Sequence, residues 1–530
     1  MGRSLSPQAR QILRSLFGWL ASIVVLSSST SAWAQVPRFD IERFDVQGNT
    51  LLPEREVKGV LATFTGKNRE LADVQRAAKS LQDEYRRAGY VAVLVTIPEQ
   101  EVRGGSVLLR VSEGRISHVR VQGNRFFDEA NIRSSLPALK EGTSPNTRQL
   151  ADAAQLANEN PAKHVGIALR AEDLENVEAT VSVADDDPSK VSLFVDNTGT
   201  APTGHYRAGI GYRNANLFNR DQVLTAQVVT SPTRLNDVLV AGVGYRAPIY
   251  RWRGVFDAVL GYSNVDAGTV QDLFSVSGSG TFLALRYTQH LRRFGTYEHR
   301  LQLGWDRREF QNSVSFLGTG ESLVPDVTVQ PVALTYTGRS RQIGSELSFY
   351  VSAARNVPGS GDASQAAFSA TRLGAKDDYS VYRGGAAYSY ALPRDYLFRA
   401  VVDGQYSNDL LIPGEQFGMG GTNSVRGFFE REVINDTGLR FSVEGYTPDF
   451  GRRFDERWSI RALAFADAAS GRDNEPIRQP SNKLSSIGLG LRMIIAKSLD
   501  IRVDWAYVTQ GAGSRPTGSN RLHFAAAYVF

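Results

Sequence analysis

The sequence contains no cysteine, so it can form neither a disulfide nor a thiolate metal site. After residue 34 it also lacks any run of about eighteen apolar residues, which excludes a transmembrane helix in that part of the chain. A GxxxxGK motif followed by Ser or Thr is missing, so the usual phosphate-binding loop is excluded. Stability must therefore come from packing and hydrogen bonding, and a membrane role would require a barrel of strands.

Residues 1–34 have the pattern of a secretory signal peptide. They carry three arginines and no acidic residue, an apolar stretch at Leu16–Leu26 that is too short to span a bilayer, and a cleavage site at Ala32-Trp33-Ala34. Removing them lowers the formal net charge from +5 by three, to +2. The basic balance of the whole chain thus arises largely from the signal peptide, and we predict no nucleic-acid partner.

Residues 39–188 contain two copies of one β-α-α-β-β pattern, at a period of about 75 residues. Gly48-Asn49 ends the first strand of one copy and Gly123-Asn124 ends that of the other. The first copy predicts strands at 39–48, 90–97 and 107–111, with helices beginning near Pro53 and spanning 70–88; the second predicts strands at 116–121, 164–169 and 178–183, with helices at 128–136 and 147–158.

From Val191 the helical period gives way to alternating segments. Leu499, Ile501 and Val503, for example, alternate with Asp500 and Arg502. The segments reach the roughly 9–11 residues that cross a bilayer at a tilt, and aromatics stand at their ends, so we expect lipid and not a second sheet on the apolar face. About sixteen strands are predicted, at 191–197, 205–213, 222–229, 237–245, 254–263, 280–288, 297–308, 330–337, 342–352, 381–390, 397–406, 438–446, 457–467, 485–494, 499–508 and 521–530.

Both N-terminal copies resemble POTRA domains, the periplasmic modules of outer-membrane secretion and assembly barrels. Tyr85-Arg-Arg-Ala-Gly-Tyr-Val91 and Val111-Ser-Glu-Gly114 are similar to motifs of the first POTRA domain in two-partner secretion transporters, and Asn158-Glu-Asn-Pro161 resembles the second. The resemblance implies POTRA domains at residues 35–114 and 115–189, then a 16-stranded antiparallel transmembrane β-barrel at residues 190–530 in a bacterial outer membrane.

A Gly-rich loop at residues 418–430 precedes the twelfth predicted strand and contains Val425, Arg426, Gly427 and Phe428. Alone, such a stretch is typical of a surface turn. It is, however, similar to the sixth-loop signature of the two-partner secretion family, in which the loop folds into the barrel and its arginine pairs with an aspartate of a Phe-x-Asp-x-Gly motif. The matching positions are Phe465 and Asp467, with Ala469 in place of the final glycine; Glu430 and Glu444 are lesser partner candidates.

Two further sets of residues are predicted to contact other molecules. An extended client would pair with an open edge of the first POTRA sheet, at Tyr90, Val93, Val95, Val107 and Leu109, or with the corresponding strands of the second copy. The last segment resembles the signal that the barrel assembly machinery reads during biogenesis, and its apolar face would meet outer-membrane lipid; the residues concerned are Phe524, Tyr528 and Phe530.

The resemblance implies a transporter that secretes an unfolded partner exoprotein without ATP. The alternatives are a POTRA-barrel assembly factor, a passive porin and an enzyme barrel. The six histidines are scattered and no HExxH or GxSxG pattern occurs, so we expect no catalytic residues, no cofactor and no metal. Family members commonly carry a plug helix before the first POTRA domain. Only Gln35–Arg38 separates the expected cleavage site from the first strand, so we expect the folded-in loop to occlude the pore or the pore to be regulated differently.

Overall fold

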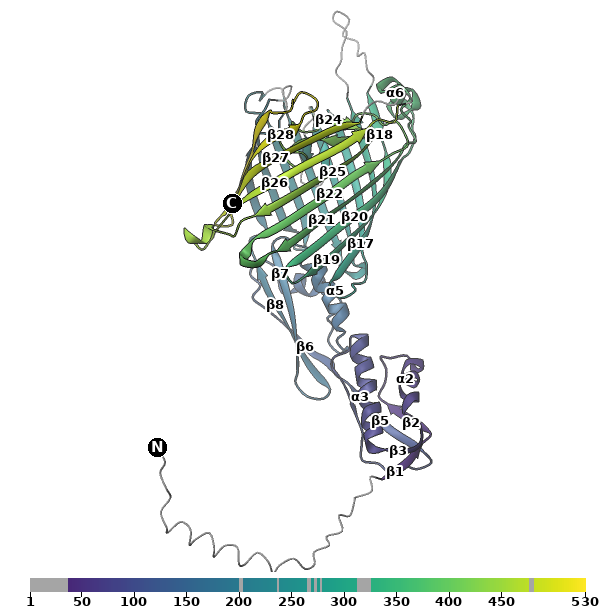
Figure 1. The fold of residues 1–530 in the computed structure, drawn as a ribbon. Coiled ribbons are helices and arrows are strands. Elements are labelled where there is room, and N and C mark those ends of the chain that lie inside the picture. Colours follow the sequence, from purple (N-terminus) through teal and green to yellow (C-terminus); the bar gives the residue numbers. More distant parts are fainter. Residues whose placement is uncertain are drawn as a thin grey trace, which may run out of the picture. The chain divides into compact units, whose positions relative to one another are not determined.

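A closed antiparallel barrel forms the C-terminal part of the chain (Figure 1). The computed structural model describes residues 37–199, 204–235, 238–264, 268–270, 274–276, 279–311, 326–475 and 481–530, so the expected signal peptide lies outside the described residues. Sixteen strands make the wall, as predicted, and β29 pairs with β9 to close it. They are β9 (Ser189–Asp196), β10 (Arg207–Leu217), β11 (Gln222–Thr230), β12 (Val240–Ile249), β13 (Gly254–Ser263), β16 (Gly280–His290), β17 (Tyr297–Phe310), β19 (Pro331–Gln342), β20 (Ser345–Asn356), β21 (Ser380–Ala391), β22 (Leu397–Tyr406), β25 (Thr437–Tyr446), β26 (Trp458–Arg472), β27 (Asn482–Ile495), β28 (Leu499–Gln510) and β29 (Asn520–Val529).

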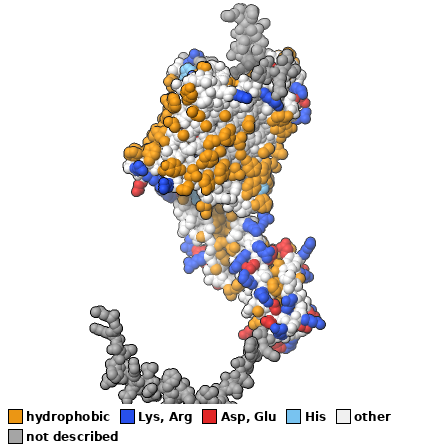
Figure 2. Space-filling model, viewed as in Figure 1, with side chains coloured by type: hydrophobic (Ala, Val, Ile, Leu, Met, Phe, Trp, Pro, Cys, Tyr) orange, Lys and Arg blue, Asp and Glu red, His pale blue; other side chains and the backbone are white. Residues whose placement is uncertain are grey.

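The side chains of the wall alternate between two environments. On β28, Trp505 and Tyr507 are 45% and 39% exposed, whereas Asp504 and Ala506, which alternate with them, are buried. The same period of two runs along the other strands, because successive residues of a strand point to opposite faces. Figure 2 shows the resulting apolar band over the outer wall, which is the surface that a bilayer covers.

The second POTRA domain contains β6 (Arg115–Gln122), α4 (Glu129–Ser135), α5 (Thr147–Ala157), β7 (Lys163–Ala171) and β8 (Asn176–Asp185), in the predicted order. Its sheet has the spatial order β6-β8-β7. Both helices begin at a polar cap: Asp128 accepts a hydrogen bond from the backbone of Asn131, and Asn146 accepts from the backbone of Arg148 and Gln149.

Polar contacts dock the second POTRA domain on the adjoining turns of the barrel. The buried Lys163 Nζ donates to Asp221 Oδ2 at 2.5 Å, and Tyr250 Oη donates to the same oxygen at 2.5 Å. Glu159 lies 2.8 Å from His290 Nε2 and 2.5 Å from Arg246 Nη2. The turn that contains Asp221 therefore lies on the side of the second POTRA domain, and alternate connections along the barrel lie on that same side.

The first POTRA domain is built from β1 (Arg38–Ile41), β2 (Arg43–Gln47), α2 (Glu54–Leu61), the 3-10 turn η1 (Ala62–Phe64), β3 (Gly66–Glu70), α3 (Leu71–Ala88), β4 (Val93–Thr96) and β5 (Ser106–Glu113). The single strand predicted at 39–48 is divided: β1 pairs with β3, and β2 lies parallel to β5. Gly48 ends β2 at φ +89, where an added Cβ would meet Val111 O at 2.2 Å.

Shorter elements lie in the connections. The connections on the POTRA side contain η2 (Tyr250–Trp252), η4 (Pro393–Asp395) and η5 (Gly451–Arg453); those on the opposite side contain β14 (Gly268–Val270), β15 (Phe274–Val276), β18 (Val327–Val329), η3 (Gly361–Ala363), α6 (Gln365–Thr371), β23 (Phe417–Met419) and β24 (Val433–Asn435). No helix in the described part of the chain has the length and apolarity needed to cross a membrane.

Candidate functional site

The site centres on the loop between β22 and β25, residues 407–436, which is the sixth connection on the side away from the second POTRA domain. A small hairpin, β23 paired with β24, stiffens its two arms. At the tip the backbone turns through Gly420 and Gly421, whose φ values are +104 and +108. Only glycine adopts these values without strain, and a Cβ on Gly421 would also overlap the Glu430 carboxylate.

Arg426 extends from this tip onto the inner wall of the barrel. Its Nε and Nη2 donate to the two carboxylate oxygens of Asp467 at 2.7 and 2.8 Å, and its backbone N–H donates to Asp467 Oδ2 at 3.1 Å. Nη1 donates to Glu444 Oε1 at 2.8 Å. The guanidinium is thus held in a two-pronged pair of the geometry that arginine favours, and the residue is 3% exposed.

The face of the guanidinium is covered by an aromatic ring. Arg426 Cζ lies 3.4 Å from the ring centroid of Phe465, the residue two positions before Asp467 on β26. Asp504 Oδ1 on β28 lies 3.7 Å from Arg426 Nη1. Phe465, Asp467, Glu444 and Asp504 all project into the lumen, so three strands of the wall contribute to one arginine site.

Apolar packing holds the residues on either side of Arg426. Val425 and Phe428 are fully buried in a lumen cluster with Met419, Leu484, Val508 and Ala469. Ala469, which stands where the family motif has glycine, packs in that cluster. Val425, Gly427 and Phe428 are therefore brought together with Phe465 and Asp467, whereas Glu430 points to the Thr422 backbone, from which it accepts a hydrogen bond at 2.7 Å.

Three further residues hold the loop and were not singled out from the sequence. His523 Nε2 on β29 accepts from the Gly427 N–H at 2.8 Å, so its Nδ1 carries the proton in the neutral ring. Arg515 Nε donates to Gly427 O at 3.1 Å, and Arg521 lies 4.0 Å over the ring of Phe429. Alternation along β29 places His523 and Arg521 on the lumen face, but it gives no hint of what they contact.

The base of the loop has a second set of buried ion pairs. Asp436 is 0% exposed and accepts from Arg372 Nη1 at 2.6 Å, the Leu411 N–H at 3.0 Å and the Asn474 N–H at 2.9 Å. Glu415 pairs with Arg308 Nη1 at 2.6 Å. The loop is therefore fixed at its base as well as at its tip.

A cavity of about 670 Å³ lies between the loop and the lumen wall. Its wall carries ion pairs of its own, Arg440–Asp403 at 2.6 Å and Arg492–Asp504 at 2.9 Å. These charges keep the wall of the cavity polar, and the loop residues Thr422, Ser424 and Arg426 line its other side.

The predicted client-binding residues of the first POTRA domain lie mostly in its core. β5 is the central strand of the order β2-β5-β4, so the expectation that Val107 and Leu109 belong to an open edge is wrong. Both side chains are buried, as are those of Val93 and Val95, while Tyr90 precedes β4 and is half-buried. The edge of β4 is outermost, but the Val95 N–H already donates to Gln82 at 3.2 Å.

The second POTRA domain offers a more open edge, on β7. The backbone N–H and C=O of Val165 both bond to the Asn158 side chain, which shows that this residue points its peptide groups away from β8. Because a strand alternates, the peptide groups of Ile167 and Leu169 point the same way. No strand within the described residues pairs with them.

The remaining predicted residues lie on the outer surface. Tyr528 and Phe530 are exposed at the end of β29, with ring centroids 4.8 Å apart, and Phe524 is half-buried on the same face.

On the second POTRA domain, His118, Glu172 and Glu178 bring potential ligand atoms within 4.8 Å of one another. Arg120 Nη2, however, lies 3.0 Å from Glu178 Oε1, so that carboxylate is already ion-paired.

Comparisons with known proteins match both the N-terminal part and the barrel part of the chain. Residues 178–493 match the family model described as haemolysin secretion/activation protein ShlB/FhaC/HecB, and residues 39–114 match the ShlB-type POTRA domain. The heme/hemopexin transporter protein HuxB of Haemophilus influenzae strain 86-028NP is 22% identical, over 95% of this chain and 89% of its own. The outer membrane transporter CdiB of Dickeya dadantii is 24% identical, over 77% and 72%. The solved structure of CdiB from Escherichia coli has a similar fold, with a TM-score of 0.75 at 17% identity and full coverage of both chains.

Proposed function

Because the chain belongs to the haemolysin secretion/activation family, and thus translocates a partner exoprotein across the outer membrane, we propose that the Arg426 loop is its gate. The POTRA domains lie in the periplasm and the barrel crosses the outer membrane. The observation that carries the proposal is the buried contact of Arg426 with Asp467 and Glu444.

The lumen cannot pass a polypeptide while the loop occupies it. The contact of Arg426 with Asp467 and Glu444, which we call the clamp, must therefore open during transport. Opening separates Arg426 from Asp467 and leaves both charges to water or to the client. In the closed state, replacing either residue would leave the other charge buried without its partner, which costs about 3–5 kcal/mol. The clamp therefore sets how often the loop leaves the lumen.

Capture takes place on the edge of β7. An extended client segment forms a new strand there by bonding to the peptide groups of Ile167 and Leu169. This recognition uses the backbone and so accepts many sequences, as an unfolded exoprotein requires. The client then passes from the second POTRA domain to the barrel turns on which that domain is docked.

Transport proceeds without ATP and without catalysis by this chain. The sequence has no GxxxxGK motif followed by Ser or Thr, so folding of the exoprotein outside the cell supplies the driving force. During biogenesis the barrel assembly machinery reads the C-terminal residues Phe524, Tyr528 and Phe530, and in the mature protein the same face contacts lipid.

The gate is tested by secretion of the partner exoprotein from cells that carry Arg426→Ala or Asp467→Ala. We expect less exoprotein in the medium, while the barrel still reaches the membrane and shows heat-modifiable migration. Arg440→Ala is the matched control, because Arg440 pairs with Asp403 on the lumen wall. Full secretion by both gate variants, or an equal defect in the control, would refute the role of the clamp.

A further inference from the structure

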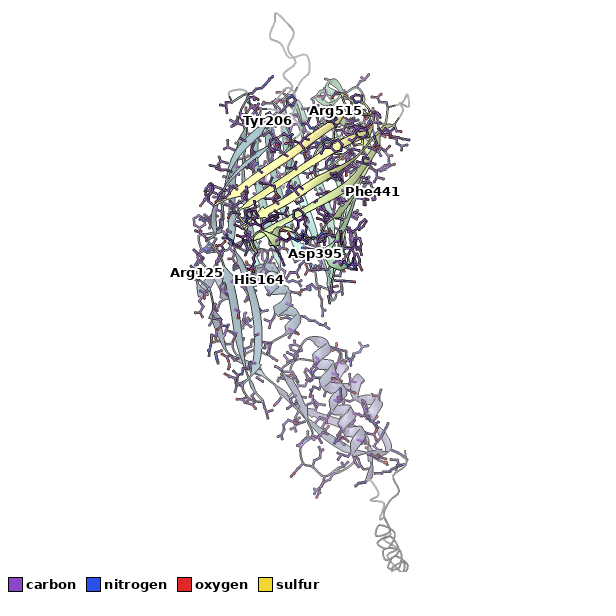
Figure 3. The ribbon with its side chains drawn as sticks, turned by 60° about the vertical axis from the view of Figure 1, so that its left-hand side comes forward. Arg125, His164, Tyr206, Asp395, Phe441 and Arg515 are labelled. Atoms are coloured by element: carbon purple, nitrogen blue, oxygen red, sulfur yellow. The ribbon has the colours of Figure 1, made fainter. Side chains whose placement is uncertain are left out.

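The turns on the periplasmic end of the barrel share a composition that transport does not explain. In the described residues, six of the seven turns place an exposed arginine beside an exposed large apolar residue, and the seventh carries Lys497. Figure 3 shows the end concerned: Asp395 lies on the same end of the barrel as the second POTRA domain, opposite Tyr206 and Arg515. The pairs are Arg220 with Phe218, Arg251 with Trp252, Arg292 with Phe294, Arg341 with Ile343, Arg394 with Tyr396, and Arg453 with Phe454.

The turn between β25 and β26, residues 447–457, is the longest of the seven and has a fixed base. Arg461 donates from Nη2 to both oxygens of Asp395 at 2.9 and 2.8 Å, and the Asp449 N–H donates to Asp395 Oδ2 at 2.9 Å. Asp449 Oδ1 in turn accepts from the Ile460 N–H at 2.9 Å. Connections of two residues suffice between antiparallel strands, so a rigid projection of this length calls for a separate role.

Two adjacent arginines, Arg452 and Arg453, stand at the tip of this turn, whose acidic residues are Asp449, Asp455 and Glu456. Among the described residues, neither Arg452 nor Arg453 forms an ion pair with a carboxylate. Asp455 is held by Arg457 at 2.9 Å, and hydrogen bonds from that residue lower the pKa of Asp455 to about 2.

An aromatic pair lies beside the two arginines. Phe454 is 69% exposed, and its ring centroid lies 6.4 Å from that of Trp458. Lys497 belongs to the next turn, which the hydrogen bond from Ala496 N–H to Arg457 O, at 3.1 Å, places alongside. In Figure 1 the η5 segment projects outward from the barrel wall and not into the lumen. A client in the lumen would not meet it.

We propose that this turn, with the arginines of the neighbouring turns, binds the phosphate headgroups of anionic phospholipids in the periplasmic leaflet. Guanidinium groups pair with phosphate oxygens in a two-pronged geometry, and exposed aromatic rings favour the boundary between headgroups and acyl chains. Both groups belong to a turn that joins the ends of two wall strands, at the level where such headgroups lie.

The test measures lipid binding by the full-length protein, independently of secretion. Protein in a neutral detergent is titrated with phosphatidylglycerol or phosphatidylcholine, and bound lipid is counted by native mass spectrometry. Each basic residue near a surface adds about 1 kcal/mol to binding of anionic lipid, so Arg452→Gln with Arg453→Gln should weaken phosphatidylglycerol binding by about tenfold or more. Binding of phosphatidylcholine should not change.

Arg86→Gln with Arg87→Gln is the matched control, since it removes the same charge from an exposed helix of the first POTRA domain. This control should bind phosphatidylglycerol like the wild type, and Phe454→Ala should weaken binding of both lipids. Heat-modifiable migration confirms that each barrel is folded. Unchanged phosphatidylglycerol binding by the Arg452 and Arg453 variant, or an equal loss in the control, would overturn the proposal.

Discussion

Arg426 and Asp467 are joined by three hydrogen bonds although 41 residues separate them in the sequence. Asp467 also accepts from Ser442 Oγ at 2.7 Å, so the carboxylate is saturated by the loop and the adjacent strand. Such a site forms only when β25 and β26 are paired and the loop is inside the barrel. It therefore reports directly on whether the loop lies inside the barrel.

His523 forms a second contact with the same loop, through the hydrogen bond that it accepts from the Gly427 N–H. His523→Ala leaves the Gly427 N–H without its acceptor, and an unsatisfied buried donor costs about 1–3 kcal/mol. We expect this variant to lose heat-modifiable migration at a lower temperature than the wild type. His523→Gln, which keeps an acceptor at a similar reach, should recover most of the difference, and His164→Ala on the exposed surface should change nothing. Equal loss with alanine and glutamine would argue against the hydrogen bond.

The open edge of β7 predicts a backbone effect on capture. Ile167→Pro removes a peptide N–H that points away from β8, so it should weaken binding of the exoprotein to the transporter while leaving the sheet paired. The measurement is co-precipitation of the exoprotein with the full-length protein. Ala168→Ser, which alters an exposed side chain and keeps the edge, is the control. Undiminished capture by the proline variant would exclude this edge.

Glu159 makes the docking of the second POTRA domain sensitive to acid. Burial opposes the charged form of Glu159, but hydrogen bonding to His290 and the charges of Arg246 and Arg300 outweigh it, so the pKa of Glu159 falls below its usual 4.5. A carboxylate with a lowered folded-state pKa contributes stability that is fully present above the unfolded pKa and is lost as the pH falls through the folded value. Docking should therefore weaken progressively below pH 4.5.

Limited proteolysis of the second POTRA domain against pH measures this effect. Glu159→Gln should expose the domain to protease at neutral pH and remove the part of the acid response that Glu159 supplies. The same acid response in the glutamine variant and the wild type would show that another group titrates.

The strands of the barrel could be predicted from the sequence because the alternation of apolar and polar residues along a strand is a local pattern. Alternation along each segment locates a strand that has lipid on one side, and even the sparse segment at 330–337 lies on β19 (Pro331–Gln342). β3 was missed, since its residues Gly66–Glu70 are polar or glycine and show no alternation. The spatial order of the first POTRA sheet was also hidden, because β5 becomes central only through its parallel pairing with β2, far away in the sequence.

Only part of the candidate site could likewise be predicted from the sequence. Arg426 and Asp467 could be matched to each other through a family motif, whereas His523 and Arg515 meet the loop only because the last strands close the barrel beside it. Their side chains carry no local pattern that distinguishes them from other lumen residues. Contacts of this kind follow from closure of the barrel and not from spacing.

Locking the loop in place tests the gate most directly. The chain has no cysteine, and a Cβ on Gly427 would lie 3.8 Å from that of Ser486, within the range of a disulfide. Gly427 has φ +96, so a cysteine there adds about 1–2 kcal/mol of strain, for which the single variant Gly427→Cys is the control. Ser485→Cys with Thr509→Cys links two wall strands and leaves the loop free.

The decisive measurement is secretion by the Gly427→Cys and Ser486→Cys double variant under oxidising and reducing conditions. The account predicts that the oxidised form retains a folded barrel but exports little exoprotein, and that reduction restores export to the level of the single variants. Export by the cross-linked protein at the level of its reduced form would contradict a loop that must leave the lumen.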